Sequence, residues 1–133
     1  MNSSKDANEL VYHEIVDMDS FDPKKLKTKD YSINSLLYFS LNKVNYKLAE
    51  WLCKLFIKSK DEDLSRLSII CLGYIAMTYR KLDLNKFIKD IVRIYYLSEN
   101  NTLKSALNDA CGDIKWYLKC KIMKKKRQFY EKN

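Results

Sequence analysis

The side chains of this sequence that could take part in catalysis do not form a familiar catalytic arrangement. Cys111 and Asp113 could be a nucleophile with an acidic neighbour, but a core thiol near a surface carboxylate is the commoner reason for such a pair. His13 is the single histidine, and no serine or cysteine stands at a characteristic spacing from it. Motifs of phosphate-binding loops, zinc proteases and serine hydrolases do not occur. The sequence therefore predicts a protein that is not an enzyme and has no small-molecule substrate.

Metal and cofactor binding are not expected either. The carboxylates of Asp61 and Asp63 lie at a predicted helix start, where the helix dipole favours negative charge without a catalytic role. The cysteines are scattered without a closely spaced pair: Cys53, Cys71, Cys111 and Cys120. The first three fall on apolar faces of predicted helices, so we expect reduced thiols in the core rather than zinc ligands. We predict no metal site and no cofactor.

The composition predicts one helical domain. The chain has 133 residues but only two glycines and one proline, so few positions suit hairpin turns. We expect a single domain over residues 1–133, flexible at residues 1–8 and about 124–133. No long uncharged apolar run and no secretory signal is recognisable, which predicts a cytoplasmic protein with no membrane partner.

The segment at residues 64–84 is predicted to be a helix with almost no water-facing side. Apolar residues occupy both of its faces, and some twenty residues without a proline are too long for a strand. Gly73 and Ala76 would allow a close backbone approach. Such a helix must be covered on both sides, as in the middle of a stack.

The neighbouring segments also read as helices, joined by short polar connectors. Ser59 and Glu62 fit a capping box at the start of the central helix, and Asp30 and Asp83 are candidate caps for other helices. Amphipathic patterns cover residues 46–58, 84–95 and 103–118, whereas residues 10–18 fit either a helix or an edge strand.

Two helices per repeat give a period of about 35 to 42 residues. The predicted fold is therefore all-α, with antiparallel helical pairs stacked as a short HEAT-like α-solenoid. A compact four- to five-helix bundle is the alternative.

Charge is divided between the two ends of the chain, which has a net charge of +8. Residues 1–22 carry six acids and one lysine, and residues 115–133 carry seven lysines and one arginine against Glu131. The basic end, with aromatic residues such as Trp116 and Tyr130, is compatible with nucleic-acid binding. It is equally typical of a solvated helix terminus.

Aromatic residues are frequent, with ten tyrosines and two tryptophans. Three of them lie on the apolar stripes and are expected to be packed: Trp51, Tyr79 and Tyr117. Three others lie off the stripes and are candidates for a surface that contacts another protein: Tyr74, Tyr96 and Trp116.

The span from about Ser35 to Leu118 resembles a family of small bacterial proteins with HEAT-like repeats. The resemblance rests mainly on CLGYIAMTYRKLDL at residues 71–84 and ALNDACGDIKWYL at residues 106–118. Members of this family act as immunity proteins of polymorphic toxin and contact-dependent growth-inhibition systems. The resemblance implies a protein that neutralises a toxin domain, such as a nuclease effector, by stoichiometric binding and occlusion.

The chain departs from the family pattern at three positions. Tyr74 replaces a histidine, Met77 an arginine, and Gly112 the first of two acids. The positions at which we expect partner contacts are Tyr74, Met77, Arg80, Tyr96, Asp109, Asp113 and Trp116. Because the chain is basic, the expected partner is a toxin with an acidic patch, or one contacted by the acidic N-terminal 22 residues. A nucleic-acid-binding helical repeat is the alternative.

Overall fold

The computed structural model describes residues 21–132, and helices with their connections make up all of this part of the chain. The longer helices are α2 (Lys29–Leu41), α3 (Tyr46–Phe56), α4 (Glu62–Tyr79) and α6 (Asn101–Lys132). The shorter elements are the 3-10 turns η2 (Pro23–Lys27) and η3 (Leu84–Lys86), the helix α5 (Ile88–Val92) and the π-helical turn η4 (Arg93–Leu97). The all-α prediction is confirmed.

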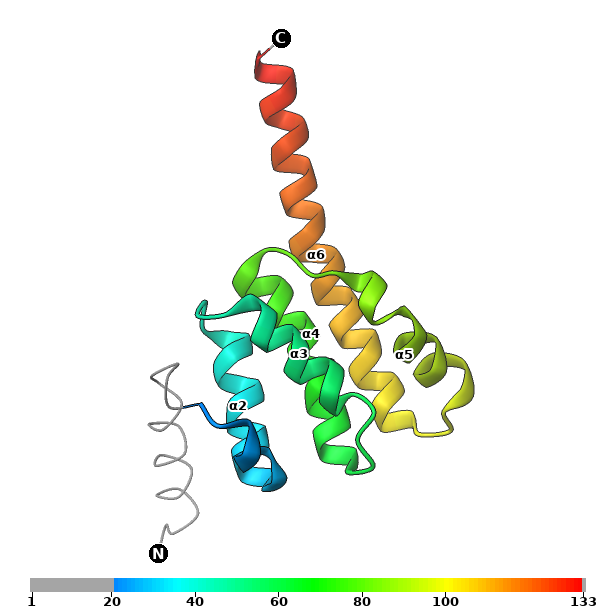
Figure 1. The fold of residues 1–133 in the computed structure, drawn as a ribbon. Helices are drawn as coiled ribbons and strands as arrows, with labels where there is room; N and C mark the ends of the chain where they lie inside the picture. Colours follow the sequence, from blue (N-terminus) through cyan, green and yellow to red (C-terminus); the bar gives the residue numbers. More distant parts are fainter. Residues whose placement is uncertain (1–20, 133) are drawn as a thin grey trace, which may run out of the picture.

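The helix α4 is the centre of the fold, as its two-sided apolar pattern predicted. It packs against α2, α3 and α6, and every residue that follows Arg66 in the helix is at least half-buried (Figure 1). The helix ends earlier than expected, at Tyr79, because Arg80 adopts a left-handed conformation with φ 57°. Its N–H then donates to the carbonyl of Ala76 and closes the last turn.

The predicted helix caps were only partly correct. Asp61, rather than Ser59, caps α4, because its side chain accepts hydrogen bonds from the N–H groups of Asp63 and Leu64. The Ser59 hydroxyl instead accepts a hydrogen bond from the N–H of Asp61, in the connection that precedes the helix. Asp30 lies in the first turn of α2 and does not precede it. Asp83 does act as a cap, but of the short turn η3.

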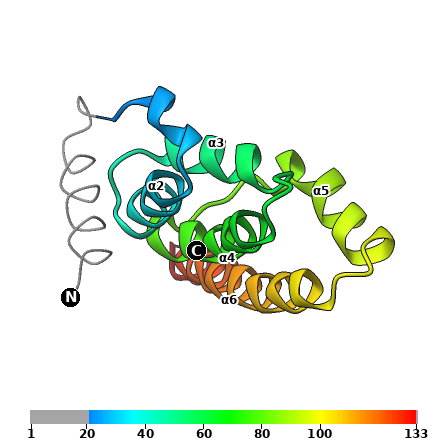
Figure 2. The ribbon, with the colours of Figure 1, turned by 90° about the horizontal axis from the view of Figure 1, so that it is seen from below.

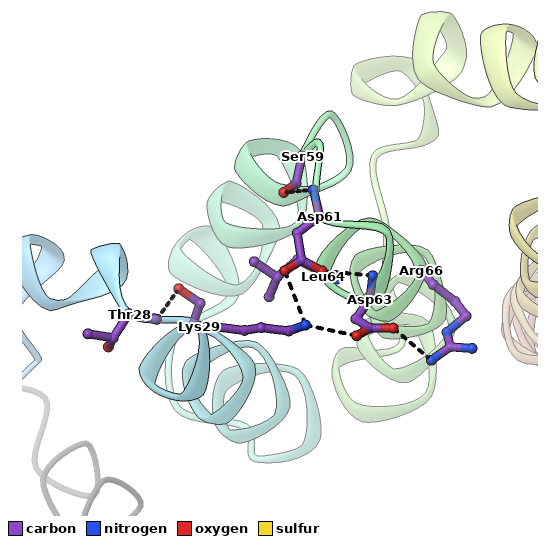
Figure 3. A network of polar contacts seen from close by, with 8 residues as sticks. Thr28, Lys29, Ser59, Asp61, Asp63, Leu64 and Arg66 are labelled. Atoms are coloured by element: carbon purple, nitrogen blue, oxygen red, sulfur yellow. Dashed lines mark hydrogen bonds and ion pairs between the residues drawn. The ribbon is translucent and has the colours of Figure 1, made fainter.

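The helices form two layers. One layer contains α2, α4 and α6, and Figure 2 shows α3 and α5 together on the side of α4 that faces away from α6. The helices α2 and α4 run parallel, since Lys29 contacts Asp61 and Asp63 near their N-terminal ends (Figure 3). At their C-terminal ends the Tyr79 hydroxyl lies 2.8 Å from the carbonyl oxygen of Phe39.

The same parallel relationship joins α4 to α6 and α3 to α5. Gly73 of α4 faces Ala110 of α6, and Lys54 of α3 is bonded to Asp90 of α5. Hydrogen bonds between successive helical pairs join residues that are 32 to 40 positions apart. This spacing matches the predicted period, and it is the spacing expected of stacked pairs, because each pair contacts the equivalent part of the next. The fold is a short α-solenoid.

The last pair is less regular than the sequence pattern suggested. We expected one helix with Ile88, Val92 and Tyr95 on its buried face, but all three are exposed. The buried positions are Phe87, Asp90 and Ile94. Asp90 turns inward toward Lys54, which rotates the segment away from the expected stripe. The π-helical turn η4 then adds a residue to the helical repeat and shifts the phase again.

The apolar stripe of α6 is confirmed at its buried centre, which consists of Ala106, Leu107, Ala110 and Ile114. Cys53 and Cys71 are buried free thiols, as predicted, and Cys111 is half-buried against the core. The backbone of α6 continues as a helix through Lys132, beyond the stack (Figure 1). The predictions for residues 1–8 and 10–18 lie outside the described residues.

Candidate functional site

The structure brings several of the predicted contact residues to the line along which α4 meets α6. The side chain of Asp113 lies against Gly73, where a Cβ atom would stand 3.2 Å from its Oδ2 atom. The Arg80 guanidinium lies 4.8 Å from the centre of the Tyr117 ring, a cation–π distance. Asp109 lines a shallow depression together with Arg66 of α4. Parts of the chain about 37 residues apart therefore share one surface.

Other predicted contact residues are placed differently. Tyr74 and Met77 are half-buried, and Tyr74 packs against the core, so it is a poor candidate for a partner contact. Their burial agrees with the two-sided apolar pattern of this helix, which predicted cover on both of its faces. Trp116 is 64% exposed on α6, whereas Tyr96, 73% exposed, belongs to η4 and stands apart from the meeting line of α4 and α6.

Trp51 is a further departure from the predicted core. We expected it to be packed, but 47% of the residue is exposed. The core side of α3 is filled by Ala49, Leu52, Cys53 and Phe56, so the indole is left on the outside. Leu55, one turn further along the helix, is also exposed. The outer side of α3 thus carries an apolar patch, of a kind that is frequent where proteins bind one another.

This patch borders a groove that the sequence did not reveal. Its α3 wall is formed by Tyr46, Lys47, Glu50, Trp51 and Lys54. Its other wall is the connection between α4 and α5, through Lys81, Asp83 and Lys86. We call this feature the lysine groove. Its two walls are far apart in the sequence, and they become adjacent because the connection between α4 and α5 stacks on α3, one repeat earlier in the chain.

The floor of the lysine groove is a buried polar cluster. Glu50 is 4% exposed, accepts a hydrogen bond of 2.6 Å from the Tyr46 hydroxyl and forms an ion pair with Lys86. The Tyr46 hydroxyl in turn accepts from the N–H of Asp83. Burial, together with the hydrogen bond to Glu50, raises the pKa of Tyr46. The hydrogen bond to Glu50 likewise raises the pKa of Lys86, so both side chains remain protonated at neutral pH.

Lys54 joins the same wall to α5. Its ammonium group donates to the Asp90 carboxylate at 2.7 Å and to the carbonyl oxygen of Lys86 at 2.5 Å. It also lies 5.6 Å from the centre of the Phe87 ring. Two of the four lysines in the groove, Lys54 and Lys86, are therefore committed to buried carboxylates and hold the stack together.

The other two lysines of the groove are exposed, and neither has a carboxylate partner among the residues that the structure describes. The ammonium group of Lys81 lies 4.3 Å from the centre of the Tyr46 ring, and Lys47 is on the outer side of α3 beside Trp51. The groove thus combines an exposed indole with two uncompensated cations. In the sequence alone, the one hint was that Trp51 is close to lysines on the predicted outer face.

The described residues contain no cluster of three or more histidine, cysteine or acidic side chains able to hold a metal ion. Burial, reinforced by a hydrogen bond with Cys71, raises the pKa of Cys53, which keeps this thiol protonated. Within the described part of the chain, the helices are too short or too polar to cross a membrane. Comparisons with protein-family models, curated proteins and solved structures found no match.

Proposed function

We propose that the protein is a cytoplasmic immunity protein that neutralises a cognate toxin domain by binding it stoichiometrically. The observation that carries the proposal is the lysine groove, in which an exposed tryptophan lies with two lysines that have no carboxylate partner among the described residues. Tryptophan is among the residues that most often dominate binding energy at protein interfaces. Residues 35–118 resemble bacterial immunity proteins, and this resemblance suggests that the partner is a toxin domain.

The stack provides a preformed binding surface. The pairs are cross-linked by Lys29 with Asp61, by Lys54 with Asp90 and by the Tyr79 hydroxyl. A surface held in this way loses little conformational entropy when a partner binds, so more of the contact energy appears as affinity. Inhibition by covering an active site or a substrate groove requires no catalytic residue from the inhibitor.

The charge of the chain restricts the partner. A protein with a net charge of +8 is repelled by a uniformly basic nuclease, whereas an acidic patch on the toxin favours association and faster encounter. Alternatively, the acidic residues 1–22 make the contact. A cognate toxin that is basic throughout and binds the lysine groove would contradict this part of the proposal.

The proposal is tested by co-expression with the variable C-terminal domain of a large secreted protein encoded next to this chain. We expect the protein to restore growth and to co-purify with the toxin domain in a fixed ratio. A toxin domain that remains lethal and does not co-purify overturns the proposal. A catalytically inactive toxin domain should co-purify equally well, because stoichiometric binding does not depend on toxin activity.

A second candidate function is nucleic-acid binding through α6. The helix extends beyond the stack to Lys132, and its last part carries most of the lysines of the basic end. A basic helix of this kind would bind phosphates with an affinity that falls steeply as salt rises. Binding of the toxin domain through an indole-centred interface should depend less on salt, so titrations at several ionic strengths separate the two functions.

A further inference from the structure

In the lysine groove, two lysines without a carboxylate partner among the described residues lie close to the apolar patch of α3. Lys47 precedes Trp51 by one helical turn on α3, and Leu55 follows by another turn, so the three side chains share one side of the helix. Lys81 enters from the opposite wall of the groove, with its ammonium group against the Tyr46 ring. The groove therefore presents the Trp51 indole together with one cation from each of its two walls.

We infer that the lysine groove is the surface that binds the partner, and that its occupant is an acidic segment of the toxin domain. An apolar side chain of that segment packs on Trp51 and Leu55, and its flanking carboxylates pair with Lys47 and Lys81. This inference rests on the proposed function and specifies which surface and which partner chemistry it uses. It moves the interface away from the line between α4 and α6, where the sequence pattern had placed most of it.

The number of free charges favours a protein segment over a nucleic acid. Affinity for a phosphate backbone grows with the number of phosphates that are neutralised, whereas the groove offers two lysines without a carboxylate partner among the described residues. Two cations beside an indole match a short acidic segment with one apolar anchor.

The first experiment measures the chemistry of the groove without the toxin. In the Trp116→Phe variant Trp51 is the remaining tryptophan, so its fluorescence reports on the groove. We expect a synthetic peptide of alternating glutamate and leucine to shift this emission saturably, and a lysine–leucine peptide to have no effect. Lys47→Glu with Lys81→Glu should abolish the shift. A shift that persists in this double variant, or one that both peptides produce, overturns the inference.

The second experiment measures binding of the toxin domain by titration calorimetry. We expect Trp51→Ala to weaken binding about 30-fold, as for a typical interface hot spot, and the lysine double variant to weaken it at least about tenfold. The matched controls are Tyr95→Ala and Arg66→Glu, which alter exposed residues away from the groove and should leave affinity unchanged. Circular dichroism confirms that each variant is folded.

The two experiments separate failure of the inference from failure of the proposed function. A toxin domain that binds the groove variants as tightly as the wild type overturns the inference and leaves the immunity function intact. If the acidic peptide binds but the toxin domain fails to bind, the immunity function is overturned, whereas the affinity of the groove for acidic segments still stands. A single-stranded oligonucleotide that displaces the peptide, or a peptide of residues 1–22 that binds more tightly than the toxin domain, assigns the groove to another occupant and also overturns the inference.

Discussion

Lys54 of α3 and Asp90 of α5 form an ion pair of 2.7 Å between residues that are 36 positions apart, one repeat of the stack. The Asp90 carboxylate is almost completely buried, whereas Lys54 reaches it from the half-exposed wall of the lysine groove. The same pair therefore holds two helical pairs in register and shapes the surface at which we place the partner.

Replacing Lys54 by methionine should lower the free energy of unfolding by about 1–3 kcal/mol, because Asp90 would remain buried without its nearest cation. The loss is smaller than for a fully buried pair, since Lys54 is partly exposed and Arg93 lies 3.6 Å from the same carboxylate. Urea denaturation measures the change.

The control is Lys58→Met, an exposed residue in the turn after the same helix, which should change the free energy of unfolding by less than about 0.5 kcal/mol. Adding Asp90→Asn to Lys54→Met should recover part of the lost stability by removing the buried charge. If Lys54→Met is as stable as the wild type, the ion pair does not hold the repeats together.

The Tyr79 hydroxyl fastens the C-terminal end of α4 to the turn between α2 and α3. It lies 2.8 Å from the carbonyl oxygen of Phe39 and accepts a hydrogen bond from the N–H of Asn45 at 3.2 Å. Tyr79→Phe keeps the packed ring and removes these bonds, so we expect a loss of about 1–3 kcal/mol in thermal or urea unfolding. Tyr95→Phe, which alters an exposed ring, should change stability by less than about 0.5 kcal/mol. Equal effects of the two substitutions would contradict the role assigned to Tyr79.

Gly73 and Gly112 provide a matched test of close packing between α4 and α6. A Cβ atom at Gly73 would stand 3.3 Å from the Cβ of Asp113 and 3.7 Å from the Cα of Ala110, whereas nothing lies within 4 Å of the same position at Gly112. Gly73→Val should therefore destabilise the protein by about 1–3 kcal/mol through overpacking. Gly112→Val should be within about 0.5 kcal/mol of the wild type, because helix propensity slightly favours valine over glycine. A Gly73→Val variant as stable as the wild type would show that α4 and α6 can move apart at little cost in free energy.

Asp61 makes stability depend on pH in the acid range. A hydrogen bond from Lys29, aided by the N–H groups at the start of α4, holds the pKa of Asp61 below its usual value. Its contribution is present above the ordinary pKa of about 3.9 and is lost as pH falls through the lower folded value.

Asp61→Asn retains a good cap but removes this titration, so its stability should fall less steeply between about pH 4 and the acid transition. Lys29→Met should have a similar effect, because it removes the cation that lowers the pKa. Urea midpoints measured across this pH range test both variants. A slope that is identical in the wild type and in Asp61→Asn would show that Asp61 does not contribute.

The local pattern was sufficient to predict the helices and the central position of α4. The buried side chains of Ile69 and Cys71 occupy opposite sides of this helix, and a helix that is apolar all round must be enclosed. The repeat period was also readable, because helices of similar length separated by short connectors stack at a constant offset. Gly73 was correctly identified as a point of close approach.

The candidate site could not be read in this way. The exposure of Trp51 depends on which four side chains of α3 fill the space against α4, and the pattern around residues 48–56 allows more than one choice. The burial of Asp90 depends on Lys54, which lies 36 positions away. That contact and the π-helical turn η4 place Ile88, Val92 and Tyr95 on the outside.

The sequence by itself determined the elements, their order and their spacing, because these follow from backbone hydrogen bonding and from the burial of apolar side chains within each helix. The tertiary structure decided which charges are neutralised and which remain free. Within the described residues, Lys54 and Lys86 each have a carboxylate partner one repeat away, whereas Lys47 and Lys81 have none. Such pairing depends on the distance in space between residues that are far apart in the sequence, and a local sequence pattern does not contain that distance.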